Sequence, residues 1–251
     1  MLLAIALTIG IASQPGQIPI PIGIDEIHPL VIEPGQPKLP EKVWRHIQFV
    51  AFVSSLGPPV TLIQDADVDV LKGRANITSV RLVDSSGITD KVVDILRTLP
   101  NLKHVEFEEV NITDEGLRKL ATIDSLERVT ICDCPISDAG IGYLAKLPRL
   151  KSLAVEQCPI FGTCLRQLEQ AKSLRKLSFS ETNVDDGIAG DIAKMKQLTD
   201  LDLSYTDITG RTLTALIKLK RLERLNLRAS ASLEEIDAFH RRRPQLYING
   251  W

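Results

Sequence analysis

Apolar and polar positions along the chain repeat with a period of 24 residues over residues 77–244. The unit that begins at Leu102 alternates apolar and polar residues as far as Phe107, which is typical of a short strand. Later apolar positions of this unit, such as Leu117 and Leu120, lie three apart, as on one face of a helix. Each unit is therefore predicted to be a strand, a turn and a helix.

Two segments carry the most regular form of the repeat, NITDEGLRKL at residues 111–120 and PISDAGIGYL at residues 135–144. With the preceding strand positions they resemble the bacterial leucine-rich repeat L-x-x-L-x-L-x-x-T-x-I-T-D-x-G-L-x-x-L. Such units cannot bury their apolar face alone and stack on their neighbours. The resemblance implies an α/β fold, a horseshoe-shaped solenoid with a parallel sheet on the concave face and helices on the convex side. We expect seven 24-residue units and a terminal strand over residues 77–251.

Small polar residues stand where most predicted helices begin. Thr113-Asp114 and Ser137-Asp138 are placed to accept hydrogen bonds from the free N–H groups of the following helix. Two later units read Phe161-Gly162-Thr163 and Thr209-Gly210 at this place. We expect the helices of those two units to be shorter or irregular.

A small residue that can form hydrogen bonds follows each predicted strand, and we expect it to bond backbone groups of the turn. The series is Cys134, Cys158, Thr182, Thr206 and Ser230, and Val110 interrupts it. Because the two cysteines lie one period apart, stacking should place them about 5 Å from each other. A disulfide and a pair of free thiols are both compatible with this spacing, and the thiols are favoured.

The N-terminal part of the chain departs from the repeat. Residues 1–13 are apolar, end in small residues and resemble a short secretory signal, which predicts an exported protein, whereas without such a signal the protein is cytoplasmic. This stretch is shorter than a membrane-spanning helix, so no integral anchor is expected. Residues 14–40 are rich in proline and read as an extended linker. Residues 41–76 are expected to form an N-terminal cap, with a helix over Glu41–Leu56 and a strand over Val60–Ile63.

The first and last units also differ from the others. One extra residue between Leu82 and Ile88 predicts a bulge in the turn of the first unit. The last helix ends in the basic run His240–Arg243, which complements the helix dipole, and a short strand over Leu246–Ile248 is expected to close the sheet.

Composition limits the kinds of function. With 30 Lys plus Arg against 32 Asp plus Glu, the net charge is −2, so no basic field favours nucleic-acid binding. The sequence holds no G-x-S-x-G, no H-E-x-x-H and no phosphate-binding glycine loop, and we expect neither catalysis nor a cofactor, a metal or a small-molecule substrate. His104 near Glu106 and Glu108 is interpreted as part of an ordinary polar sheet surface.

The function is therefore expected to lie on the concave face, where residues that alternate with the core leucines point outward. Acidic residues predominate in the first two-thirds of this face, which predicts a protein or peptide partner, with a basic one favoured. The candidate partner-binding residues are Glu106, Glu108, Glu109, Thr130, Asp133, Glu156, Gln157, Ser178, Glu181, Asp202 and Tyr205.

Two alternatives remain beside this non-catalytic scaffold. LPEKVWRHI at residues 39–47 resembles the opening of an F-box, which implies an adaptor that selects substrates for a ubiquitin ligase. That motif needs about twice the helical length available before Gly57. A structural role in the cell envelope is the second alternative.

Overall fold

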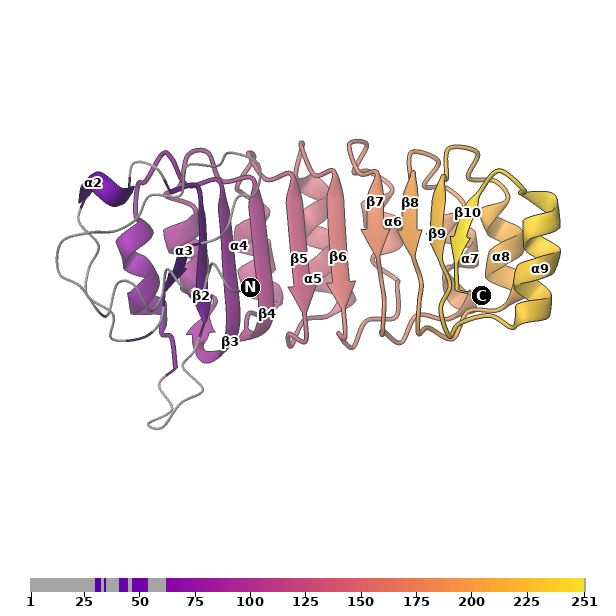
Figure 1. Ribbon diagram of the computed structural model, residues 1–251, viewed down its shortest axis with the longest axis horizontal. Coiled ribbons are helices and arrows are strands. Elements are labelled where there is room, and N and C mark those ends of the chain that lie inside the picture. The colour runs from indigo at the N-terminus through magenta and orange to yellow at the C-terminus, as the bar shows by residue number, and fades with distance from the viewer. Residues whose placement is uncertain (1–29, 33, 35–40, 45–46, 54–61, 251) are drawn as a thin grey trace.

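The computed structural model describes residues 30–32, 34, 41–44, 47–53 and 62–250. Ten strands of the described residues form one sheet in chain order, each parallel to the next, and most of the helices lie behind this sheet (Figure 1). The strands are β1 (Leu30–Ile32), β2 (Phe49–Val53), β3 (Ser79–Thr89), β4 (His104–Asn111), β5 (Arg128–Cys132), β6 (Ser152–Glu156), β7 (Lys176–Ser178), β8 (Asp200–Asp202), β9 (Arg224–Asn226) and β10 (Tyr247–Asn249).

The α-helices are short, as expected for units that contribute only two turns each to the convex side. They are α2 (Glu41–Trp44), α3 (Val92–Leu96), α4 (Asp114–Leu120), α5 (Asp138–Tyr143), α6 (Leu165–Leu168), α7 (Ala189–Ile192), α8 (Gly210–Leu216) and α9 (Leu233–Arg242). The 3-10 helices are η1 (Asp65–Leu71), η2 (Leu144–Lys146) and η3 (Asp186–Ile188).

Strand pairing follows the sequence period. Val105 pairs with Val129, and Ile131 pairs with Val155, each partner standing 24 positions later. The inward-facing side chains therefore stack in continuous rows, and Phe107 and Phe179 in these rows are fully buried. This arrangement confirms the predicted α/β solenoid with its parallel sheet and helices on the opposite side.

The predicted bulge in the first unit is confirmed. Strand β3 pairs regularly with β4 up to Ser85, and the register then shifts between Ser85 and Thr89. The Ser85 hydroxyl is buried and donates to the carbonyl of Ile63 at 2.5 Å, so this turn is bonded to the segment before the first unit.

The helix expected over Glu41–Leu56 is wrong beyond its first turn, since α2 is followed by strand β2. The sequence of β2, FVAFV, consists mostly of β-branched and aromatic residues, which favour strands, and Val50 and Phe52 are buried. Pairing with β3 supplies the contacts that an isolated helix here would lack. Strand β2 also stands where the F-box resemblance implies further helix.

Other N-terminal expectations are only partly covered by the structure. Strand β1 lies within the segment interpreted as a linker and pairs with β2. The segment read as a signal, residues 1–13, lies outside the described residues. Of the strand expected over Val60–Ile63, the first two positions lie outside them too, and Gln64 makes an isolated bridge with Gly87.

Short contacts join α2 to the segment after η1. Trp44 is 2% exposed, and the Arg74 guanidinium lies 4.2 Å from its ring centroid. Arg74 also forms an ion pair with Glu41 at 2.8 Å. That this region shields the end of the stack remains a prediction.

The C-terminal end agrees closely with expectation. Helix α9 begins with a reciprocal cap between Ser232 and Glu235, and β10 closes the sheet within one residue of the predicted place. The basic run has a structural role, because the Arg243 guanidinium donates to the carbonyls of Leu219 and Leu222 at 3.0 and 3.1 Å.

Leu203 tests the register of the core. Its side chain is fully buried in the row that also contains Phe179, so Leu203→Ala should lower the free energy of unfolding by about 2 to 5 kcal/mol. Leu233→Ala is the matched control, because Leu233 is 64% exposed and its truncation should change stability by less than about 0.5 kcal/mol. Urea unfolding measures both, and equal shifts for the two variants would contradict the register.

Candidate binding surface

Outward-facing side chains of the sheet lie in rows that cross the strands. The amino row, nearest the strand starts, includes His104, Arg128, Lys176, Asp200 and Arg224. The middle row is Arg81, Glu106, Thr130, Ala154, Ser178, Asp202, Asn226 and Asn249. The carboxyl row contains Glu108, Cys132 and Glu156. Basic side chains thus gather near the strand starts and acidic ones near the strand ends.

A further row, which we call the rim, lies at the carboxyl ends of the strands. Its residues all have a positive φ, between 46° and 55°, a left-handed conformation that is uncommon for residues other than glycine. The rim consists of Asp84, Glu109, Asp133, Gln157, Glu181, Tyr205 and Ala229. This conformation turns the chain out of the sheet at the same place in every unit.

The eleven candidate residues divide between these rows. Glu109, Asp133, Gln157, Glu181 and Tyr205 are exposed on the rim. The other six are half-buried on the strand face, and they are Glu106, Glu108, Thr130, Glu156, Ser178 and Asp202. The structure therefore brings the candidates together along one side of the concave face.

Arg81 neutralises the N-terminal end of the expected acidic patch. Its Nε lies 3.0 Å from Glu106 Oε1, and its Nη2 lies 2.5 Å from Glu108 Oε2. Burial raises the pKa of Glu106, and Glu108 and Glu156 raise it further, while Arg81 opposes them. Arg81 belongs to the first unit, whereas the predicted patch begins with the second, so sequence reasoning missed this partner.

Hydrogen bonds fix the middle of the patch. Glu156 accepts from the Ser178 hydroxyl at 3.0 Å. On the rim, Gln157 accepts from the Cys132 thiol at 3.2 Å and donates to Glu181 at 2.9 Å. These bonds hold neighbouring units in one arrangement and leave the outer side of the rim exposed.

A hollow of about 290 Å³ lies over β6 to β10, in the C-terminal half of the face. Small side chains form its floor, among them Ser152, Ala154 and Ser178, and the amino-row residues Lys176 and Arg224 stand beside them. Of the candidate residues, only Ser178 and Asp202 line this hollow. Sequence reasoning missed it, although the run of small residues in the middle row indicates it.

Two groups near the hollow are fixed by polar or ring contacts. Asp202 accepts from the Ser204 hydroxyl at 2.6 Å and from the Asn226 amide at 2.8 Å. Tyr205 on the rim is 43% exposed, and the Arg228 guanidinium lies 5.7 Å from its ring centroid. Tyr205 thus offers an aromatic surface that is already oriented.

His104 is the histidine of the amino row, at the start of β4. Burial lowers the pKa of His104, and the charge of Arg128 lowers it further, so this imidazole is neutral at pH 7. Within the part of the chain that the structure describes, no three His, Cys, Asp or Glu side chains are grouped so as to hold a metal ion. No helix among the described residues has the length and apolar character to cross a membrane.

The residues after the strands bond backbone groups, as predicted. Thr182 and Thr206 donate to the carbonyls of Phe179 and Leu203 at 2.7 and 2.6 Å. Cys134 and Cys158 are buried free thiols. Burial raises the pKa of Cys134 to about 12, so this thiol remains protonated at neutral pH.

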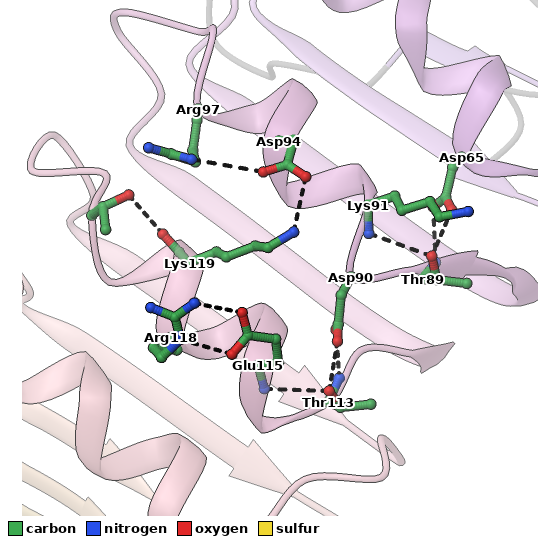
Figure 2. Close-up of polar contacts among 11 residues, drawn as sticks. Asp65, Thr89, Asp90, Lys91, Asp94, Arg97, Thr113, Glu115, Arg118 and Lys119 are labelled. Carbon is green, nitrogen blue, oxygen red and sulfur yellow. Dashed lines mark hydrogen bonds and ion pairs between the residues drawn. The ribbon is translucent and has the colours of Figure 1, made fainter.

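A ladder of carboxylates joins successive units on the side toward the helices (Figure 2). Asp90 accepts from the backbone N–H and the hydroxyl of Thr113, at 2.8 and 2.6 Å. Asp114 accepts in the same way from Ser137. Thr113 and Ser137 are the residues that cap their own helices, whereas the aspartates serve the unit that follows.

The ladder changes at the two units with unusual sequences. Asp138 accepts from the N–H groups of Phe161 and Cys164, and α6 has only four residues, which confirms the short helix expected there. The same expectation is wrong for α8, which has seven residues. Glu235 reaches back and accepts from the N–H of Gly210 at 2.8 Å, which ties α8 to the last unit.

Comparisons with known proteins agree with this architecture. The family described as Leucine Rich repeat matches residues 98–121. A leucine-rich repeat protein of Leptospira interrogans is similar in structure, with a TM-score of 0.50 and 17% identity over 75% of this chain and 52% of that chain. The chain thus spans about half the length of the Leptospira protein. With its repeat and its parallel sheet, the chain has the fold of a leucine-rich repeat protein.

A second solved structure, internalin C2 of Listeria monocytogenes, gives a TM-score of 0.49 and 16% identity. The match covers 75% of this chain and 84% of that chain. No curated protein matches the sequence.

Asp186 tests the carboxylate ladder. It accepts from the N–H of Thr209 at 2.9 Å and from the hydroxyl of Thr212 at 2.6 Å. Burial raises its pKa, but the hydrogen bonds from both threonines lower it more, so the pKa lies below its ordinary value of 3.8. Asp186→Asn should lower the free energy of unfolding at pH 7 by about 1 kcal/mol, a small loss because the carboxylate is partly exposed.

The effect of Asp186→Asn should depend on pH. A carboxylate whose pKa falls on folding stabilises the fold above its unfolded pKa and loses that contribution as pH falls through its folded pKa. The difference between wild type and variant should therefore be largest near pH 7 and shrink below about pH 4. Thermal unfolding from pH 7 to about pH 2.5 measures this, with Asp124→Asn as the exposed control. A constant difference would refute the role of the charge.

Proposed function

We propose that this protein is a non-catalytic scaffold whose concave face binds a protein or peptide partner. The observation that carries this proposal is the division of charge across the face. Carboxylates follow one another along the rim and the carboxyl row from β4 to β7, while basic side chains stand in the amino row. A partner with a basic segment along the rim matches this division.

The effective acidic surface is smaller than the set of candidates. Arg81 already pairs with Glu106 and Glu108. Among the described residues, Glu109, Asp133, Glu156 and Glu181 have no such ion pair. They are the carboxylates that a basic partner can reach without displacing an internal cation, and they carry more of the proposed recognition than Glu106 or Glu108.

The hollow provides a recess for a partner's side chain. A partner that lies across the strands meets small side chains at Ser152, Ala154 and Ser178, which leave room for a projecting side chain. Tyr205 adds an exposed aromatic group at the rim, a residue type enriched where interfaces concentrate their binding energy. The hollow therefore favours a polypeptide partner, whose side chains can project into it, over a flat partner surface held by charge alone.

Charge removal tests the proposal. A triple variant with Asp133→Asn, Glu156→Gln and Glu181→Gln should lose most capture of its partner from native extract, followed by mass spectrometry. Asparagine is chosen at position 133 because it tolerates the positive φ of this residue. The control variant, Asp124→Asn, Glu169→Gln and Glu234→Gln, removes the same charge away from the concave face and should capture normally.

A substitution that fills the hollow tests the proposal independently of charge. Ala154→Trp places an indole in the hollow and should also abolish capture, because the partner cannot then approach the sheet. If both concave-face variants capture the same proteins as wild type while the chain remains folded, the partner binds elsewhere and the proposal is wrong.

A further inference from the structure

Phe161 is an exposed aromatic residue at a place where four other units carry a polar cap. The equivalent residues Thr113, Ser137, Asp185 and Thr209 each accept a hydrogen bond from the N–H two residues later. A phenyl ring cannot do so, and 59% of Phe161 is exposed to solvent. The residue therefore lacks the helix-capping role of its equivalents and is not buried in compensation.

Other apolar residues extend this exposed surface. Pro159 lies two residues before Phe161, and Pro135 stands one unit before Pro159; both are exposed. Equivalent positions of neighbouring units are about 5 Å apart in a parallel stack. We call Pro135, Pro159 and Phe161 the edge patch, because stacking places the two exposed prolines in one row and Phe161 follows Pro159 by two residues. Because proline has little conformational freedom to lose, contact with this patch costs little entropy.

Negative charge predominates in the rows at the strand ends that include Pro135 and Pro159. From the second unit to the sixth, the rim and the two rows that follow it contain no lysine or arginine. The same rows contain the carboxylates Glu109, Asp133, Glu181 and Asp207, and Asp185 stands one unit after Phe161. An apolar patch within a field of negative charge favours a basic partner over an acidic one.

We propose that the edge patch is a second docking surface, which takes a basic segment of a partner protein and seats a large apolar side chain of that segment on Phe161. This surface lies beside the strand ends, outside the hollow of the concave face, and it does not require the concave face to be occupied. The two surfaces together allow one protein to bridge two segments or two partners.

Three synthetic peptides test the proposal. The first has a central Leu-Trp pair flanked by lysines, the second has glutamate in place of lysine, and the third has serine in place of Leu-Trp. Fluorescence anisotropy should show binding of the first peptide alone, and its addition should shift the amide NMR signals of residues around Phe161.

The variant Phe161→Thr introduces the residue type that Thr113 and Thr209 supply at the equivalent place. It should weaken binding of the first peptide about tenfold or more without unfolding the chain.

Two control variants separate the edge patch from general apolar adhesion and from the hollow. Leu233→Thr removes a similarly exposed apolar side chain at the equivalent place of the last unit and should leave binding unchanged. Ala154→Trp blocks the hollow and should also leave it unchanged, which distinguishes the edge patch from the concave-face function. The proposal is overturned if no peptide binds, if the glutamate peptide binds as well as the lysine peptide, or if Phe161→Thr binds like wild type.

Discussion

The parallel register of the strands is the constraint on which the rest of this structure depends. Because each paired residue from β4 to β9 faces the one 24 positions later, side chains there stack on the same position of the neighbouring units. A unit buries its leucines only against the next unit, so the core is a set of rows without a centre. The same stacking arranges the surface into rows. A residue type that recurs at one position of successive units therefore forms a continuous row across the sheet.

The sequence alone predicts the role of most residues that lie within the 24-residue repeat, and of fewer residues outside it. The inward rows, the bulge after Ser85 and the threonine and serine caps follow from the repeat itself. Strand β2 falls before the repeat, where only local pattern was available, and its apolar residues also fit a helix; pairing with β3 decides the outcome. Arg81 was missed for a related reason, because an ion pair between units depends on side-chain reach as well as on register.

The rim illustrates a signal that the sequence contains but hydrophobic periodicity does not reveal. All seven of its residues have a positive φ, and none is β-branched. Valine, isoleucine and threonine are disfavoured in this conformation, so their exclusion from one position of every unit indicates a left-handed turn. The turn therefore takes the rim residues out of the regular alternation of the strands.

Stacking like positions has an electrostatic consequence for the rim. Carboxylates at equivalent positions of adjacent units, about 5 Å apart, repel each other by up to about 1 kcal/mol in water. Gln157 stands between Asp133 and Glu181 and donates to the latter, which limits the repulsion at the centre of the row. No such donor separates Glu109 from Asp133 among the described residues, and a bound cationic side chain would relieve the repulsion there. The affinity for a basic partner that we propose for the rim would therefore arise from the same register that forms the core, and it should weaken as salt screens the exposed charges.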